Sequence, residues 1–174
     1  IGEVMCGDRQ MARFMQRLLG YSTFGHQKEQ VAVFLTGSEE SQKTNGSNGK
    51  SVLLRTFRAV MGEHASVVDR SLLVESKNGG GGIPNDVAKL AGARVGIGSE
   101  FKRTDVLSED RFKSMTGEDA VQARFLNKEF FEFMSIATLF YATNTVPLIT
   151  GMDDGFWRRL LLVPFEAKWY RLEE

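Results

Sequence analysis

A glycine-containing segment, Gly46-Ser47-Asn48-Gly49-Lys50-Ser51, most restricts the fold open to this 174-residue chain. It follows a continuous apolar run at residues 31–35 and precedes a helix-like stretch at residues 50–60. A run that is apolar on both faces is typical of a buried parallel strand. Glycines between such a strand and a helix let backbone N–H groups converge on phosphate oxygens, and the helix adds the positive end of its dipole. The segment therefore predicts a phosphate-binding loop made by its six residues.

Two residues of this segment have specific expected roles. Lys50 would reach the β- and γ-phosphates of ATP, and the Ser51 hydroxyl would bind Mg²⁺. The usual pattern, G-x-x-x-x-G-K-[ST], has a glycine where this chain has Thr44, and the nearest glycine after the strand is Gly37. We therefore expect an enlarged loop. The alternative is a surface turn rich in Gly and Asn that precedes Lys-Ser by coincidence.

Short apolar runs alternate with helix-like segments along the rest of the chain, which predicts an α/β fold with a parallel sheet covered on both faces. Residues 1–30 read as a helical segment leading into an ATPase domain at 31–174. Further helices are expected at residues 85–90 and 109–115. Further strands are expected at 65–68, 95–97, 139–142 and 160–163.

Composition places limits on the class of protein. With 42% hydrophobic residues, the chain can bury its own core. Its 22 basic and 22 acidic residues argue against a histone-like DNA binder, although a few basic loops would suffice for a ring-shaped motor. Cys6 is the single cysteine, which favours a reducing compartment. No apolar run approaches the roughly 20 residues that span a bilayer. Because the chain begins at Ile1, we expect a piece of a longer protein.

Polar residues follow two of the expected strands. Glu100 comes after the run at 95–97, where an acid could hold Mg²⁺ or activate water, and Asn144 follows the run at 139–142, where an amide could contact the γ-phosphate. Each alone is also compatible with an ordinary loop or turn residue. The adjacent Arg158 and Arg159 could complete a neighbouring subunit's site, or pair with Asp153 or Asp154 within the chain.

These pieces, in this order, resemble the superfamily 3 helicases, and specifically the phage and plasmid primase–helicase branch that includes poxvirus-like and satellite-phage proteins. The resemblance runs through nearly the whole chain. It is carried by residues 18–21, 29–30, 48–51, 88–94, 99–100, 116–119, 124, 142–144, 156–159 and 164–165. It implies an AAA+-like P-loop NTPase, usually a hexameric ring, in which ATP hydrolysis drives translocation along DNA.

The resemblance also implies roles for single residues. Lys50 and Ser51 would hold ATP and Mg²⁺, Glu100 would be the acidic motif, Asn144 the sensor, and Arg158 or Arg159 the finger acting in trans. Many relatives carry two adjacent acids where this chain has Ser99-Glu100. Residues 115–133 match a hairpin that lines the family's central channel. Arg124 and Lys128 are the candidates in this hairpin for contact with DNA phosphates. An equally weighted alternative is that Lys128 is a solvated turn lysine and Arg124 a structural salt-bridge partner.

Two other functions remain open from the sequence. One is a small P-loop kinase that passes phosphate to a metabolite. The arginine pair downstream of an asparagine sensor argues against it, because a monomeric kinase has no need of such a pair. The other is a nucleotide-binding assembly module without activity, which Thr44 favours. For a motor of this family, the expected place is the cytoplasm of a bacterial host, if a phage or plasmid encodes it.

Overall fold

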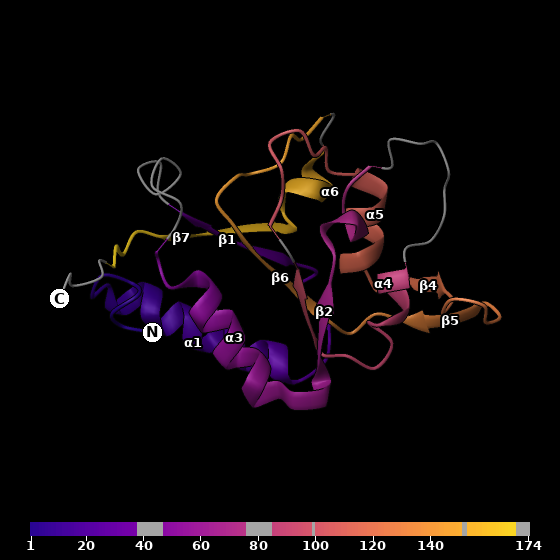
Figure 1. Cartoon of the computed structure of the whole chain (residues 1–174), viewed down its shortest axis with the longest axis horizontal. Coiled ribbons are helices and arrows are strands. Elements are labelled where there is room, and N and C mark those ends of the chain that lie inside the picture. The colour runs from indigo at the N-terminus through magenta and orange to yellow at the C-terminus, as the bar shows by residue number, and fades with distance from the viewer. Residues whose placement is uncertain (38–46, 76–84, 99, 151–152, 170–174) are drawn as a thin grey trace.

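The computed structural model describes residues 1–37, 47–75, 85–98, 100–150 and 153–169 (Figure 1). The helices are α1 (Arg9–Thr23), α3 (Lys50–Met61), α4 (Asn85–Ala88), α5 (Glu109–Thr116) and α6 (Asp154–Trp157), with short 3-10 turns at Gly62–His64 and Arg70–Leu72. The strands are β1 (Ala32–Gly37), β2 (Ala65–Val68), β3 (Val95–Gly98), β4 (Ala120–Ala123), β5 (Phe131–Met134), β6 (Thr138–Thr143) and β7 (Leu160–Phe165).

Five strands form one parallel sheet in the order β2-β3-β6-β1-β7. This confirms the predicted α/β class. The strand order places β1 between β6 and β7 and β3 next to β6, so the carboxyl ends of β1, β3 and β6 adjoin at one edge. Ligands of open parallel sheets bind outside such an edge.

Both faces of the sheet are buried, which explains why β1 has no polar side. Ala32 and Phe34 belong to a core on one face, whereas Val33 and Leu35 belong to a core on the other. The second core contains residues of α1 and α3, and the first contains residues of α5 and α6; Figure 1 shows these helix pairs on opposite sides of the sheet.

One sequence-based expectation is wrong in detail. The helix expected at 85–90 ends at Ala88, and Gly92 with φ +79° follows in the turn that leads to β3. The arginine pair lies in the turn between α6 and β7, immediately after the end of the short helix. Asp153 caps α6 by accepting a hydrogen bond from the Phe156 N–H at 2.9 Å, a standard helix start.

Strand β7 lies at the edge of the sheet, where its Pro164 is tolerated because an edge strand needs only one side paired. None of the described helices is long and apolar enough to cross a bilayer.

Candidate nucleotide site

Lys50, Glu100 and Asn144 meet at the carboxyl edge of the sheet. Lys50 is the first residue of α3, Asn144 directly follows β6, and Glu100 lies two residues after β3. The Lys50 Nζ donates to Asn144 Oδ1 at 2.7 Å and to Asn48 Oδ1 at 3.1 Å. The Asn144 N–H donates to Glu100 Oε1 at 3.1 Å. Three residues predicted from separate parts of the sequence therefore share one connected polar cluster.

The Lys50 ammonium is buried, with 6% of the residue exposed. Burial lowers the pKa of Lys50 below its usual value, and the nearby charge of Glu100 partly opposes this shift. Both hydrogen-bond acceptors of the ammonium are neutral amide oxygens. A buried cation held by amides is poorly compensated, and it would gain from a bound anion such as phosphate.

Two described residues just before α3 have backbone conformations in the left-handed region. Ser47 and Gly49 have φ values of +63° and +85°. A Cβ on Gly49 would lie 2.6 Å from Val4 Cγ1, so glycine is required here by both conformation and space. Gly49 starts α3 without a side-chain cap, which leaves the first N–H groups of the helix available for an anion. Gly46 and Thr44 lie outside the described residues.

The segment after β7 is attached to this loop, which the sequence did not indicate. Asn48 Nδ2 donates to the Ala167 carbonyl at 2.9 Å, and the Trp169 N–H donates to the Ser47 carbonyl at 3.0 Å. Asn48 is therefore a buried structural residue whose amide oxygen faces Lys50 and whose amide nitrogen holds the chain's later segment. No local sequence signal near Trp169 could have revealed this contact.

Ser51 and Glu100 line one cavity of about 400 Å³, together with Arg55 and Arg58 of α3. A hydroxyl and a carboxylate suit Mg²⁺, which prefers oxygen ligands and usually keeps several waters. Within the described residues no group of three or more His, Cys, Asp or Glu side chains gathers for a metal. The prediction from the sequence did not include Arg55 and Arg58, although their spacing from Ser51 puts all three residues on one face of the helix.

Arg159 is a structural residue. It is half-buried, and its Nη1 donates to the Gly155 carbonyl at 2.7 Å while its Nη2 donates to Gln30 Oε1 at 2.6 Å. Burial, followed by the charge of Arg158, lowers the pKa of Arg159. Arg158 is exposed, and among the described residues its side chain has no ion pair or hydrogen bond. Of these two described arginines, Arg158 is therefore the one whose side chain is free to reach another molecule.

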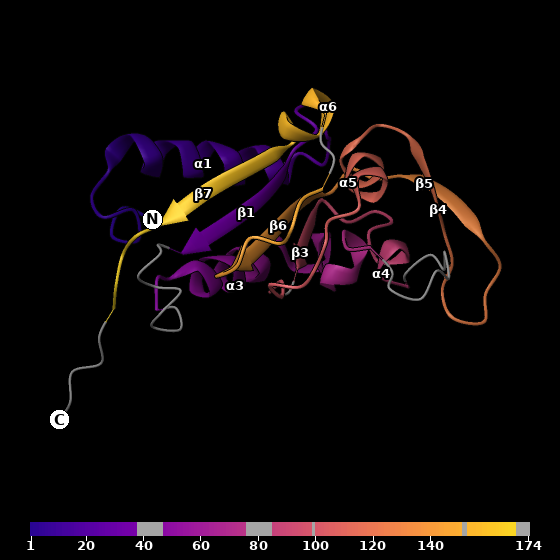
Figure 2. The same cartoon turned by 90° about the horizontal axis from the view of Figure 1, so that it is seen from above.

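Both arginines lie at the opposite end of the sheet from Lys50. The Ala32 N–H at the start of β1 donates to the Arg159 carbonyl at 2.9 Å, whereas Lys50 belongs to the helix beyond the end of β1 (Figure 2). The five residue steps from Ala32 to Gly37 cover roughly 17 Å. The structure does not bring the arginine pair to the site of its own chain.

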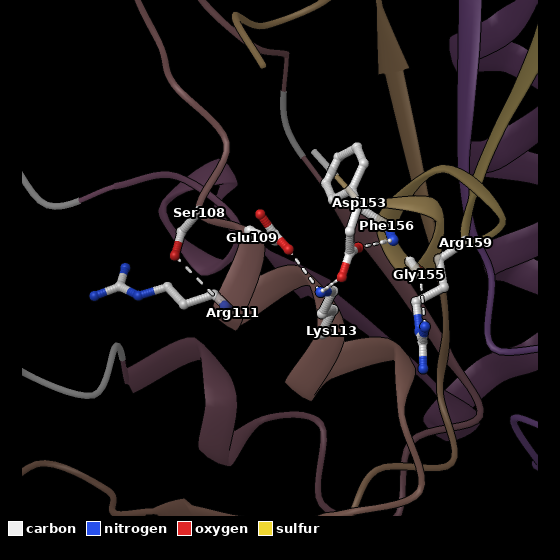
Figure 3. Close-up of polar contacts among 8 residues, drawn as sticks. All are labelled: Ser108, Glu109, Arg111, Lys113, Asp153, Gly155, Phe156 and Arg159. Atoms are coloured by element: carbon white, nitrogen blue, oxygen red, sulfur yellow. Dashed lines mark hydrogen bonds and ion pairs between the residues drawn. The ribbon is translucent and has the colours of Figure 1, made fainter. Parts of the chain in front are cut away.

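An ion-pair cluster joins α5 to α6 next to the arginines (Figure 3). The Lys113 ammonium bridges Glu109 at 2.6 Å and Asp153 at 2.7 Å. Its hydrogen bond to Asp153 is the main cause that raises the pKa of Lys113, and the same bond lowers the pKa of Asp153. Asp153 therefore both begins α6 and ties it to α5. The proposed pairing of Arg158 or Arg159 with Asp153 or Asp154 is not among the ion pairs of the described residues.

Strands β4 and β5 form the hairpin expected within residues 115–133. Arg124 and Lys128 are both exposed in its connecting turn, and the Arg124 guanidinium lies 4.8 Å from the centre of the Phe130 ring. Figure 2 shows the hairpin extending away from the main sheet.

Comparison with known proteins finds relatives among viral proteins. Residues 43–159 match a family described as a family of unknown function, DUF5906. The chain is 31% identical over 167 residues to a protein of Acanthamoeba polyphaga mimivirus named as a putative helicase, covering 96% of this chain and 17% of that protein. It is 34% identical over 116 residues to a protein of African swine fever virus (strain Badajoz 1971 Vero-adapted) named as a putative primase, covering 66% of this chain and 12% of that protein.

A solved structure shares the fold. The apo C-terminal region (305–718) of NrS-1 superposes with a TM-score of 0.65 at 16% identity, covering 98% of this chain and 39% of that chain. The chain spans about a sixth of the mimivirus relative, so it corresponds to one segment of a longer protein there. These relatives are viral proteins, and they do not show the bacterial phage or plasmid setting expected above. The chain belongs to the DUF5906 family and is related to viral proteins named as helicases and primases.

Proposed function

We propose that this chain is the ATP-hydrolysing motor domain of a replicative DNA helicase. The observation that carries the proposal is the convergence of Lys50, Asn144 and Glu100 at the carboxyl edge of the sheet. A buried, amide-held lysine at a helix start is suited to polyphosphate, and a carboxylate beside it is suited to orienting water. The relatives named as helicases support the coupling to DNA.

In the proposed mechanism, Lys50 exchanges its amide partners for the β- and γ-phosphates, and the amide of Asn144 is released to face the γ-phosphate or the attacking water. Water attacks the γ-phosphorus, the bond to the β-phosphate oxygen breaks, and Glu100 orients the water and accepts its proton. Ser51 and Glu100 would hold Mg²⁺, which neutralises charge on the phosphates when it is bound.

Arg158 of a second copy would complete the site, because Arg158 cannot reach Lys50 within one chain. A guanidinium stabilises the charge that develops on the transferring phosphoryl group. Such head-to-tail contacts generate rings when the rotation closes. We propose a ring, by family resemblance a hexamer, with Arg124 and Lys128 on the hairpin that contacts DNA phosphates. ATP hydrolysis would then move this hairpin along the DNA.

The test is ATP turnover measured with and without single-stranded DNA, at several protein concentrations. The motor predicts DNA-stimulated turnover that rises more than linearly with protein concentration and is lost in Lys50→Ala. Turnover that is indifferent to DNA and to protein concentration would instead indicate the small kinase, with phosphate passed to a metabolite. Nucleotide binding without any turnover would indicate the inactive assembly module.

A further inference from the structure

A cavity of about 770 Å³ opens beside the phosphate-binding loop, on the side where α3 faces the N-terminal segment. Ser47 and Gly49 of the loop form part of its wall, and Val52 of α3, Val4 and Trp169 form others. The walls are mainly aliphatic and aromatic. Cavities of this size and character are typical of small-molecule and cofactor sites.

The cavity is built into the loop and is more than a gap in the surface. The Trp169 N–H donates to the Ser47 carbonyl at 3.0 Å, and Asn48 Nδ2 holds the carbonyl of Ala167 at 2.9 Å. Val4 lies so close to Gly49 that no side chain fits between them, and Trp169 Nε1 would lie 3.7 Å from a Cβ built at the same position. Two walls from distant parts of the sequence are therefore fixed to the same few loop residues.

The position of the cavity indicates what enters it. Val52 comes directly after Ser51, so the cavity begins within the first turn of α3, where the phosphates would lie. A group joined to the phosphate chain by a few bonds would extend along this turn into the cavity. The exposed apolar side chains of Val52 (56%) and Trp169 (48%) would then be covered by a flat ring.

We propose that this cavity binds the base and sugar of the nucleotide, with Trp169 as the wall that contacts a face of the base and Val4 as a neighbouring apolar wall. The proposal rests on the proposed function, since it needs the phosphates at Lys50. Walls of this kind contact ring faces and read few hydrogen-bonding edges, and strong discrimination between bases needs such edges. ATP and GTP therefore bind with affinities within about tenfold of each other.

Tryptophan fluorescence tests the proposal directly, because the chain has two tryptophans, Trp157 and Trp169. Trp157→Phe leaves Trp169 as the single reporter. Titration with Mg-ATP or Mg-GTP should change its emission, whereas inorganic tripolyphosphate, which has no base, should bind without that change. Trp169→Ala should weaken ATP binding by about tenfold or more, a typical loss for a stacked base, and leave tripolyphosphate affinity unchanged.

Matched variants separate this inference from the proposed function. Trp157→Ala removes an equally exposed tryptophan on α6 and should leave both affinities unchanged, and Trp169→Phe should recover most of the ATP affinity. Equal binding of ATP and tripolyphosphate, insensitive to Trp169→Ala, would overturn the base site while phosphate binding at Lys50 stood. Affinities for ATP and GTP that differ by more than about tenfold would overturn the proposal that the cavity contacts the base mainly through its ring face. Failure of every ligand to bind would overturn both proposals.

Discussion

The Lys50 ammonium and the Asn144 side-chain oxygen are 2.7 Å apart although 94 positions separate them in the sequence. The parallel pairing of β1 with β6 creates this contact, because it aligns the ends of two strands whose following residues are Asn144 and the loop that leads to Lys50. The contact gives Lys50 a neutral partner that phosphate can replace.

Lys50 should therefore control nucleotide-dependent stability. A ligand at a hundred times its dissociation constant stabilises the folded chain by about 2.7 kcal/mol, which for a domain of this size raises the melting temperature by roughly 5–10 °C. We expect Lys50→Ala to lose this shift with Mg-ATP. Arg13→Ala, an exposed arginine on α1, is the control and should keep it. An undiminished shift in Lys50→Ala would contradict the phosphate-binding role.

Nucleotide binding should also take up protons at alkaline pH. Burial lowers the pKa of Lys50 in the free chain, and phosphate charges would raise it again on binding. Between the two pKa values the free lysine is neutral and the bound lysine is charged, so affinity should fall as pH rises through this window. Calorimetry in buffers of different ionisation enthalpy measures the protons taken up. Affinity that rises over the same window would contradict this linkage.

Gly98 should be intolerant of any side chain. A Cβ at this position would lie 1.8 Å from Tyr141 Cε1, and the Tyr141 ring is fully buried against Phe101 at 4.8 Å between centroids. We expect Gly98→Ala to destabilise the chain by at least about 1–3 kcal/mol, the usual cost of overpacking.

Gly20 offers the matched control for that substitution. It lies within α1, and nothing approaches a Cβ built on it within 4 Å. Gly20→Ala should stabilise the chain by about 0.5–1 kcal/mol, because alanine loses less backbone freedom in a helix. Denaturant unfolding of both variants measures the contrast. Similar stability of the two alanine variants would contradict the packing around Tyr141.

The Lys113 cluster should set the position of Arg158 and should be sensitive to pH. Asp153 has a lowered pKa, so its contribution is present above its usual value of 3.8 and is lost as pH falls through the folded value. Lys113 has a raised pKa, so its contribution is present below 10.5 and is lost as pH rises through the folded value. Lys113→Met should therefore lower the melting temperature between about pH 4 and 10, and the difference should vanish in stronger acid.

Lys113→Met should also reduce DNA-stimulated turnover, because α6 would no longer be tied to α5. Lys89→Met is the control, since Lys89 pairs with Asp86 three positions away on α4 and does not contact α6. Equal turnover in the two variants would show that the cluster supports the fold alone.

The sequence predicted what local patterns encode. Apolar runs located the five strands of the main sheet, of which β1 and β6 are buried on both faces. The ends of two of these runs indicated Glu100 and Asn144, and the resemblance implied their roles. What the sequence could not supply was long-range pairing. The attachment of Trp169 to Ser47, and of Arg159 to Gln30, depends on which strands are neighbours. For the same reason our proposal of Arg158 rather than Arg159 as the finger rests on the fold.

A mixing experiment tests the central claim, that Lys50 of one copy and Arg158 of another form one ATPase site. Lys50→Ala and Arg158→Ala should each be inactive alone. Mixed in equal amounts, they should recover up to about a quarter of wild-type turnover, because random assembly pairs an intact Lys50 with an intact Arg158 at that share of interfaces. Full activity of Arg158→Ala alone, or no recovery in the mixture, would contradict the claim.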